Sequence, residues 1–200
     1  MAKALIDLVK KNFADAVLEA HSLCGDDTLV VDARHWKAIH RFLRDSPLAS
    51  MDMLTDLTAV DFPDREPRFE VVSHLYSLSK GHRLRLKARV GDEDGEVVEL
   101  DTLTELWASA NWMERECFDM FGVRFLGHPD LRRILLYPEF EGYPLRKDYP
   151  ADRIQPLIPY RDVPNTEKIA PFGPDEGMSF GRKTHRSGVA ASTAKNGEAD

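Results

Sequence analysis

In residues 82–90, apolar and basic side chains alternate along the chain. The apolar set is Leu84, Leu86, Ala88 and Val90, and the basic set is Arg83, Arg85, Lys87 and Arg89. Because successive residues of a β-strand point to opposite faces, this pattern predicts an antiparallel strand with one packed face and one basic face. The basic face either lies in solvent or contacts a partner or the acidic loop at 92–96, and these alternatives stay open.

Further strands are predicted on the N-terminal side of this run. Residues 53–61 contain Leu, Thr and Val, residues 68–78 contain Val, Leu, Phe and Tyr, and a short apolar run occupies residues 28–31. The Ser79-Lys80-Gly81 step suits a hairpin turn into the alternating strand.

Two helices are predicted in the first quarter of the chain. Residues 3–20 place apolar side chains at three- and four-residue spacing, which is typical of an amphipathic helix. Asp32 is a predicted N-cap for a second helix that runs to Asp45.

Two more helices are predicted after residue 100. Thr102 with Glu105, and Asn111 with Glu114, have the spacing of capping boxes. The second of these helices is expected to stop at Gly122.

The character of the chain changes after about residue 123. Nine prolines fall between residues 129 and 174, yet the segment keeps apolar side chains, among them Ile154, Leu157 and Ile158. We predict a compact α+β domain over 1–128, with a mainly antiparallel sheet and helices on one side. An extended proline-rich arm that binds a partner is predicted over 129–185, and a flexible tail over 186–200. Local folding or disorder stays open as an alternative for 137–180.

Composition excludes several classes of protein. The net charge of −7 argues against a general nucleic-acid binder, which would present a basic surface. Two cysteines are too few for a disulfide framework, and no apolar run approaches the length of a membrane span. The first residues lack the pattern of a secretory or transit segment, so we expect a cytosolic chain that meets the membrane only through partners.

The candidate ligand and nucleophile patterns are weak. An iron–sulfur cluster normally takes four thiolates, and no histidine pair has metal-ligand spacing, so no metal site is expected in this chain. The run Gly181-Arg182-Lys183-Thr184 lacks the flanking strand and helix of a phosphate loop. Cys117 is interpreted as a small core residue, with a reactive thiol as the alternative.

Residues 114–119 carry an unusual density of charge, and three interpretations stay open. Arg115 and Asp119 could pair at i,i+4 on a solvated helix face. Alternatively, Glu114 and Glu116 point to different sides, one capping its own helix and the other anchoring a basic group of the tail or of a partner. A catalytic pair of carboxylates is the third interpretation.

This block continues into a longer motif of fixed spacing. Its members are Glu114, Arg115, Glu116, Asp119, Met120, Phe121, His128, Arg132, Ile134 and Leu135. A second motif, at 141–150, contains Tyr143, Arg146, Lys147 and Tyr149, which are residue types suited to a protein interface. Solvated charge is the alternative for Arg146 and Lys147. Together the two motifs resemble the 30 kDa subunit family of respiratory NADH:quinone oxidoreductase (complex I).

The resemblance, over roughly residues 28–160, implies a peripheral-arm subunit with a structural or assembly role and no catalytic residue of its own. FMN, the iron–sulfur clusters and quinone are then held by other subunits, and the two motifs contact partners. The implied partners are the quinone-site subunit (the 49 kDa subunit) and neighbouring iron–sulfur subunits. Electron transfer from NADH to quinone and proton translocation belong to the whole complex, on the cytoplasmic side of the bacterial plasma membrane.

Two alternatives from other classes remain. One is the equivalent subunit of a related membrane-bound hydrogenase or of a ferredoxin-linked or deazaflavin-linked complex. The other is a free-standing binding domain with a disordered tail.

Overall fold

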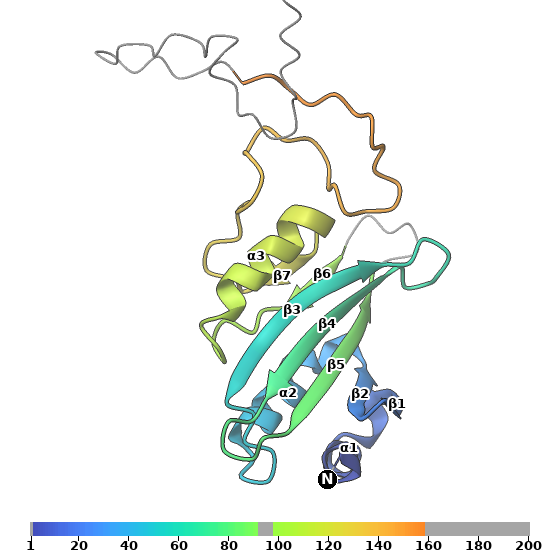
Figure 1. Cartoon of the computed structure of the whole chain (residues 1–200), viewed down its shortest axis with the longest axis vertical. Coiled ribbons are helices and arrows are strands. Elements are labelled where there is room, and N and C mark those ends of the chain that lie inside the picture. The colour runs from blue at the N-terminus through green and yellow to red at the C-terminus, as the bar shows by residue number, and fades with distance from the viewer. Residues whose placement is uncertain (1, 92–97, 159–200) are drawn as a thin grey trace, which may run out of the picture. The chain divides into compact units, whose positions relative to one another are not determined.

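A computed structural model describes residues 2–91 and 98–158 of the chain (Figure 1). The elements in chain order are α1 (Ala2–Asn12), η1 (Ala14–Ala16), β1 (Val17–Leu23), β2 (Asp26–Val31), η2 (Ala33–His35), α2 (Trp36–Asp45), β3 (Met53–Asp61), β4 (Phe69–Tyr76), β5 (Arg83–Val90), β6 (Glu99–Asp101), α3 (Ala110–Phe121) and β7 (Arg124–Leu126). The predicted acidic loop at 92–96, the end of the predicted arm and the predicted tail lie outside the described residues.

The main sheet has five strands in the order β1-β2-β5-β4-β3. The pairs β1–β2, β5–β4 and β4–β3 are antiparallel, so the mainly antiparallel α+β prediction is confirmed. The central pair β2–β5 is parallel, because the chain crosses over through α2 and the β3–β4 hairpin before it returns. A second, two-stranded sheet pairs β6 with β7 in parallel, and α3 is the crossover between them.

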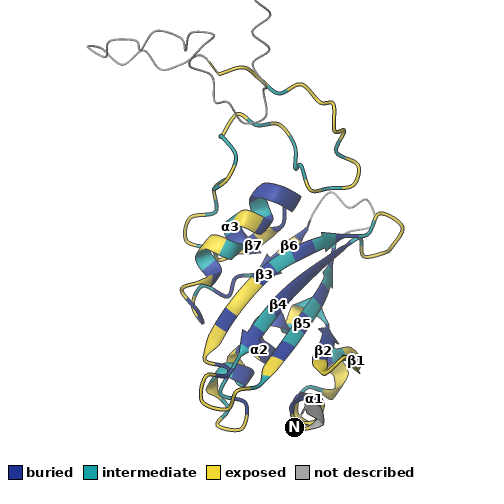
Figure 2. Cartoon of the chain, viewed as in Figure 1, coloured by how far each residue is buried: buried dark blue, intermediate teal, exposed yellow. Residues whose placement is uncertain are grey.

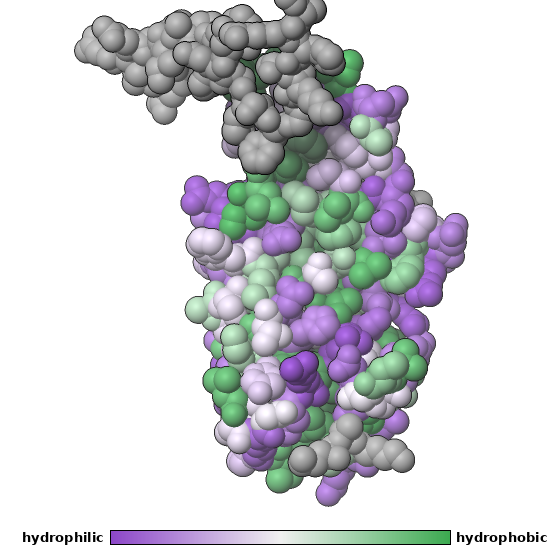
Figure 3. Space-filling model, in the orientation of Figure 1, coloured by the Kyte–Doolittle hydropathy of each residue, from purple (hydrophilic) through white to green (hydrophobic). Residues whose placement is uncertain are grey.

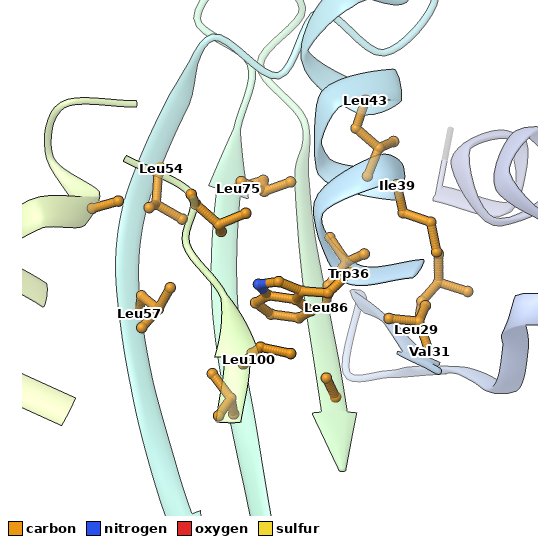
Figure 4. Packing of buried hydrophobic residues seen from close by; sticks show 14 of the residues in the cluster. Leu29, Val31, Trp36, Ile39, Leu43, Leu54, Leu57, Leu75, Leu86 and Leu100 are labelled. Carbon is orange, nitrogen blue, oxygen red and sulfur yellow. The ribbon is translucent and has the colours of Figure 1, made fainter. Parts of the chain in front are cut away.

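One hydrophobic core lies between the sheet and the helices. Trp36, Ile39 and Leu43 of α2 pack against Leu29 and Leu86 of the neighbouring strands β2 and β5, as Figure 4 shows. Residues from α1 and α3 belong to the same cluster, so the helices cover one side of the sheet, as predicted. Figure 2 shows the resulting alternation of buried and more exposed positions along the strands.

A buried histidine ties α2 to the sheet. The His40 ring lies 2.7 Å from the carbonyl oxygen of Trp36 and 2.8 Å from the hydroxyl oxygen of Ser73 on β4. Burial lowers the pKa of His40 to about 4, so its imidazole is neutral at physiological pH. His40 therefore acts as a hydrogen-bonding core residue.

The basic row of β5 lies on the sheet face opposite this core. Three of its members pair with acids on other strands of the sheet: Lys87 with Glu70 of β4 at 2.7 Å, Arg85 with Asp26 of β2 at 3.6 Å, and Arg89 with Glu19 of β1, two strands away, at 2.7 Å. The side chain of Glu70 is buried beneath its basic neighbours. The row is thus largely neutralised within the sheet.

The prediction of a helix over 3–20 is wrong in its second half. The helix ends at Asn12, and residues 17–23 form β1, which pairs with β2 in a hairpin. Cys24 and Gly25 occupy its two-residue turn with φ values of 54° and 89°, the geometry of a turn that matches strand twist. Pairing with β2 therefore overrides the helical spacing of Ala16 and Val17.

Both predicted capping boxes after residue 100 are also wrong. No helix forms between Thr102 and Ser109, where the chain is mainly in turns. Helix α3 begins at Ala110, so neither Asn111 nor Glu114 is at its cap. The predicted stop at Gly122 is confirmed, since Gly122 ends α3 with a φ of 81°. The Asp32 prediction is confirmed only in part: its side chain accepts the Arg34 N–H and caps the 3-10 helix η2, which leads into α2, whereas His35 is the N-cap residue of α2 itself.

Candidate functional site

Helix α3 carries the charged block, residues 114–119. The helix has three sides with different surroundings. Ala110, Cys117 and Met120 belong to the hydrophobic core. A second side, which includes Arg115 and Asp119, contacts the chain segment 128–146. The third side, with Trp112 and Glu116, is exposed. Because helix neighbours lie three and four residues apart, every third or fourth residue returns to the same side.

Asp119 is fully buried and collects the backbone of the segment that follows α3. Its Oδ2 accepts the N–H groups of Ile134, Leu135 and Leu136 at 3.0, 2.7 and 2.9 Å. Its Oδ1 accepts a hydrogen bond of 2.8 Å from the Arg133 guanidinium. Burial by itself raises the pKa of Asp119, but these hydrogen bonds outweigh it and lower the pKa below the ordinary value. The carboxylate is thus an ionised anchor for three successive peptide groups.

Arg133 continues the same network into the next part of the segment. Its guanidinium also donates to the carbonyl oxygens of Asp119, Phe140 and Gly142, at 3.1, 3.0 and 3.0 Å. A guanidinium offers five N–H donors in a fixed plane, so one side chain can hold several carbonyls in register. Arg133 therefore fixes the turn at 140–142 against the C-terminal half of α3.

Arg115, one turn before Asp119, holds the backbone just ahead of Arg133. It donates to the carbonyl oxygens of Arg132 and Arg133, both at 3.1 Å. His128 lies one further turn back along α3, where its Nε2 is 3.2 Å from the carbonyl oxygen of Asn111. Its Nδ1 accepts the N–H of Asp130 at 3.0 Å, so the proton lies on Nε2. The segment thus runs along α3 in the direction of the helix.

Residues of the second motif, at 141–150, contact the C-terminal end of α3. Arg146 donates to the carbonyl oxygen of Phe121 at 2.6 Å, and its guanidinium lies 4.7 Å from the centre of the Tyr143 ring. A Cβ atom built on Gly122 would lie 2.6 Å from Tyr143 and 2.7 Å from Arg146. Gly122 therefore ends the helix and also leaves the space in which these two side chains lie.

A second buried carboxylate, Asp61 at the end of β3, holds the chain after Tyr143. Arg68 binds both of its oxygens, at 2.6 and 2.7 Å, and the N–H of Lys147 donates to Oδ2 at 2.7 Å. Arg68 also pairs with Asp148 at 3.0 Å. Burial raises the pKa of Asp61, but Arg68 and the Lys147 N–H lower it below the ordinary value. Asp61 and Asp119 thus anchor the segment at two points.

Glu114 has a different environment, since no cation contacts its carboxylate in the described part of the chain. It is buried and accepts hydrogen bonds from the Thr102 hydroxyl at 2.6 Å and the Leu103 N–H at 2.7 Å. Burial raises the pKa of Glu114 to about 7, against the opposing effect of these two donors. Glu114 therefore holds the turn before α3 and is close to its protonation midpoint at neutral pH.

Residues 137–156 form a loop whose two ends are joined by hydrogen bonds and an ion pair. The Tyr137 hydroxyl donates to the carbonyl oxygen of Pro156 at 3.1 Å, and Arg153 pairs with Glu141 at 2.8 Å. The side chain of Gln155 bonds both the N–H and the carbonyl oxygen of Glu141, at 2.9 and 3.1 Å. Inside the loop the rings of Phe140 and Tyr149 stack with centroids 6.1 Å apart.

These contacts decide between the interpretations of the charged block. The predicted Arg115–Asp119 pair is wrong, because Asp119 pairs with Arg133 and Arg115 binds backbone carbonyls. Glu114 and Glu116 do point to different sides, as one interpretation held, although Glu114 holds the preceding turn and does not cap its own helix. The interpretation of Cys117 as a core residue is confirmed, since it is 2% exposed and its Sγ lies 3.6 Å from the Leu57 carbonyl oxygen.

Several predicted site residues act through their backbone. Ile134, Leu135 and Lys147 contribute N–H groups, and the side chain of Leu135 is exposed. Arg132 is exposed, and among the described residues its one ion pair is with Asp130, at 3.0 Å. Met120 and Phe121 are buried core residues. The contacts of these residues with partner proteins stay predictions.

Sequence reasoning missed three residues of this site: Arg133, Asp61 and Arg68. The adjacent pair Arg132-Arg133 gave a signal, but nothing in a local pattern shows which arginine turns inward. Asp61 and Arg68 lie far from the charged block in sequence and reach the segment only through the β3–β4 hairpin.

In the part of the chain that the structure describes, no cluster of three His, Cys, Asp or Glu residues has a metal-binding arrangement. No helix among those same residues is long and apolar enough to cross a membrane.

Comparison with known proteins shows a consistent set of relatives. A family model described as "Respiratory-chain NADH dehydrogenase, 30 Kd subunit" matches residues 29–155. An NADH-quinone oxidoreductase subunit of Rhizobium etli is 40% identical over 165 residues, which cover 82% of this chain and 80% of that protein. An NADH-quinone oxidoreductase subunit of Hyphomonas neptunium is 38% identical over 191 residues, covering 88% and 93%. That of Geobacter sulfurreducens is 46% identical over 149 residues, covering 74% and 88%.

Replacing Asp119 with Asn should lower the free energy of unfolding by about 2–4 kcal/mol, because the amide cannot serve both Arg133 and the three N–H groups. Denaturant unfolding of the purified chain measures the loss. Glu116→Gln, on the exposed side of the same helix, is the control and should change stability by less than about 0.5 kcal/mol. Similar losses in both variants would contradict the anchor role of Asp119.

Gly122→Ala should destabilise the chain more than Gly25→Ala does. Both glycines have positive φ, at 81° and 89°, but nothing lies within 4 Å of a Cβ on Gly25. The backbone strain common to both is about 1–2 kcal/mol, and displacement of Tyr143 and Arg146 should add about 1–3 kcal/mol at Gly122 alone. Thermal unfolding of the two variants gives the difference, and equal melting temperatures would show that the contact at Gly122 is not tight.

Glu114→Gln should change the pH dependence of stability. The folded pKa of about 7 exceeds the ordinary value of 4.5, so between these pH values the folded chain keeps a proton that the unfolded chain has released. Wild-type stability therefore falls as pH rises through this window, by up to about 3 kcal/mol. Relative to wild type, the variant should be favoured more at pH 8 than at pH 5, as measured by urea unfolding at both. A pH-independent difference would refute the raised pKa.

Proposed function

Because this chain belongs to the 30 kDa subunit family of respiratory-chain NADH dehydrogenase, we propose that it is a structural subunit of an NADH–quinone oxidoreductase, without a catalytic centre of its own. The match covers well over half of the chain, and the similar proteins all carry the name of one and the same subunit of that enzyme. These names favour the NADH-linked complex over the hydrogenase-type alternative.

One observation carries the structural role: the charged residues of the signature hold this chain's own backbone. Asp119 binds three peptide N–H groups and Arg133, while Arg115 and Arg133 bind backbone carbonyls. A general base or nucleophile must reach a reacting atom of a substrate. Asp119 is fully buried, and its lone pairs are already engaged.

These anchors fix the direction in which the chain leaves α3, and the segment that follows presents apolar side chains to solvent. Ile154 is 92% exposed and Leu157 is 97% exposed, which is a large cost for a free surface. We propose that these residues bind neighbouring subunits, chiefly the quinone-site subunit (the 49 kDa subunit) and the adjacent iron–sulfur subunits. A loop already closed by its own hydrogen bonds loses less entropy on binding than a free strand does.

The redox groups are assigned to other subunits in this proposal. FMN, the iron–sulfur clusters and quinone would be held elsewhere, because a cluster normally takes four thiolates and this chain has two cysteines. Burial raises the pKa of Cys117 well above its ordinary value, which makes it a poor thiolate ligand. Cys24 lies on the surface, in the turn between β1 and β2.

The activity and its location then follow from the assembly. Electron transfer from NADH to quinone, coupled to proton translocation, would be carried out by the whole complex. The chain would sit on the cytoplasmic side of the bacterial plasma membrane and meet the membrane only through its partners. Its contribution would be to hold neighbouring subunits in fixed geometry, since small displacements degrade a preorganised site.

Replacing both Ile154 and Leu157 with Ser in the full chain should lower the amount of assembled complex several-fold, while the melting temperature of the purified subunit stays within a few degrees. Loss of apolar contact area at the interface is the reason. Native gels of membranes, with NADH–quinone oxidoreductase activity, measure the assembly. The control replaces Leu23 and Leu78, which are 72% and 67% exposed, with Ser. Unchanged assembly in the first variant, or an equal loss in the control, would contradict the binding role of these two residues.

A further inference from the structure

The outward side of α3 carries an aromatic ring and a carboxylate one helical turn apart. Trp112 and Glu116 are four residues apart, so their side chains lie next to each other on the helix surface. Trp112 is 71% exposed, and Glu116 is also exposed. Figure 3 shows hydrophobic and hydrophilic residues intermixed on the face of the molecule in view.

Glu116 differs from the other charged residues of α3. Glu114, Arg115 and Asp119 each make at least two hydrogen bonds within the chain. Glu116 makes no hydrogen bond or ion pair with any residue of 2–91 or 98–158. Within the described part of the chain, the fold therefore uses three of the four charges, and the fourth has no partner there and lies beside an exposed tryptophan.

An exposed tryptophan has a physical cost that a partner can remove. Its side chain buries roughly 150–250 Å² when it is covered, more than most side chains. Tryptophan is also enriched among the few residues that dominate binding energy at protein interfaces. Trp112 does not belong to the hydrophobic core cluster, so the packing of the isolated chain gives no reason for it.

We propose that the outward side of α3 is a docking site for a neighbouring subunit, and that it receives an arginine side chain, with the guanidinium over the Trp112 indole and paired with Glu116. The inference rests on the proposed function, since it requires a partner subunit. Arginine fits both groups at once, because its planar guanidinium stacks on an aromatic face and still donates in plane to a carboxylate.

The chain itself contains an arrangement of this kind. Arg68 binds both oxygens of Asp61, and its guanidinium lies 5.1 Å from the centre of the Phe69 ring. Aromatic ring, guanidinium and carboxylate thus form one contact inside this fold. Trp112 and Glu116 supply the ring and the carboxylate of a second such contact, and the guanidinium must come from outside the described residues.

The test places a photo-cross-linking residue, p-benzoylphenylalanine, at position 112 of the full chain in cells, with a second variant at Leu23 as the matched exposed control. After irradiation of intact membranes, mass spectrometry identifies the cross-linked peptides. We expect position 112 to cross-link to another subunit, at a peptide that contains arginine, and position 23 to give no such product. Capture of no subunit at position 112, or of a peptide without arginine, overturns the proposal.

Substitutions give a second and independent readout. Trp112→Ala should reduce the amount of this subunit retained in the assembled complex by about tenfold or more, and Glu116→Gln by less. The combined variant should lose less than the product of the two single effects, because both residues act on one arginine. Leu23→Ala should have no effect, and all variants should melt as wild type does when purified alone. Independent, multiplicative losses would overturn the shared contact.

The same material separates this proposal from the proposed function. If the wild-type chain co-purifies with the other subunits while position 112 captures none of them, the docking site is wrong and the structural role stands. If the wild-type chain co-purifies with no other subunit, the proposed function itself fails.

Discussion

The geometry after α3 depends on one buried carboxylate. Asp119 is shielded from water and remains ionised, because an arginine and three peptide N–H groups surround it. A buried charge is costly unless it is fully paired, so the segment at 133–136 cannot move away without leaving that charge uncompensated. Residues 127–158 contain no helix or strand, and this requirement gives the part of them that follows α3 a defined path.

The fold treats its buried acids in two ways. Asp119 and Asp61 each have an arginine and backbone donors, which hold their pKa values low and make them permanent anchors. Glu114 has two donors and no cation in contact, so burial dominates and its pKa rises to about 7. The two ionised anchors hold the segment that leads toward the proposed partners, and the titratable one holds a turn on the other side of α3. Asp119 and Asp61 therefore stay ionised near neutral pH.

Helix α3 connects three environments with one set of twelve residues. Its core side belongs to the hydrophobic cluster, its second side seats the segment at 128–146, and its outward side leaves Trp112 and Glu116 exposed. Successive residues of an α-helix are rotated by about 100° around its axis, so adjacent side chains can contact different partners. The density of charged and aromatic residues in the signature follows from this division, since no side of the helix is free of a specific contact or an exposed functional group.

Local pattern alone determined much of the body. The alternation at 82–90, the strands at 53–61 and 68–78, the Gly122 terminus and the α+β class all follow from side-chain period and backbone preference, which act over a few residues. The motif spacing also identified the family. Local pattern failed at Val17–Leu23, where pairing with β2 outweighed helical spacing. It also failed at Thr102, whose hydroxyl donates to Glu114 and does not cap a helix.

Only the tertiary structure decided that Arg133 and not Arg132 turns inward, and that Asp61 and Asp119 both hold the segment after α3. The reason is that a buried charge is satisfied by whatever donors the fold brings to it in space, and those donors lie up to 86 residues away in sequence.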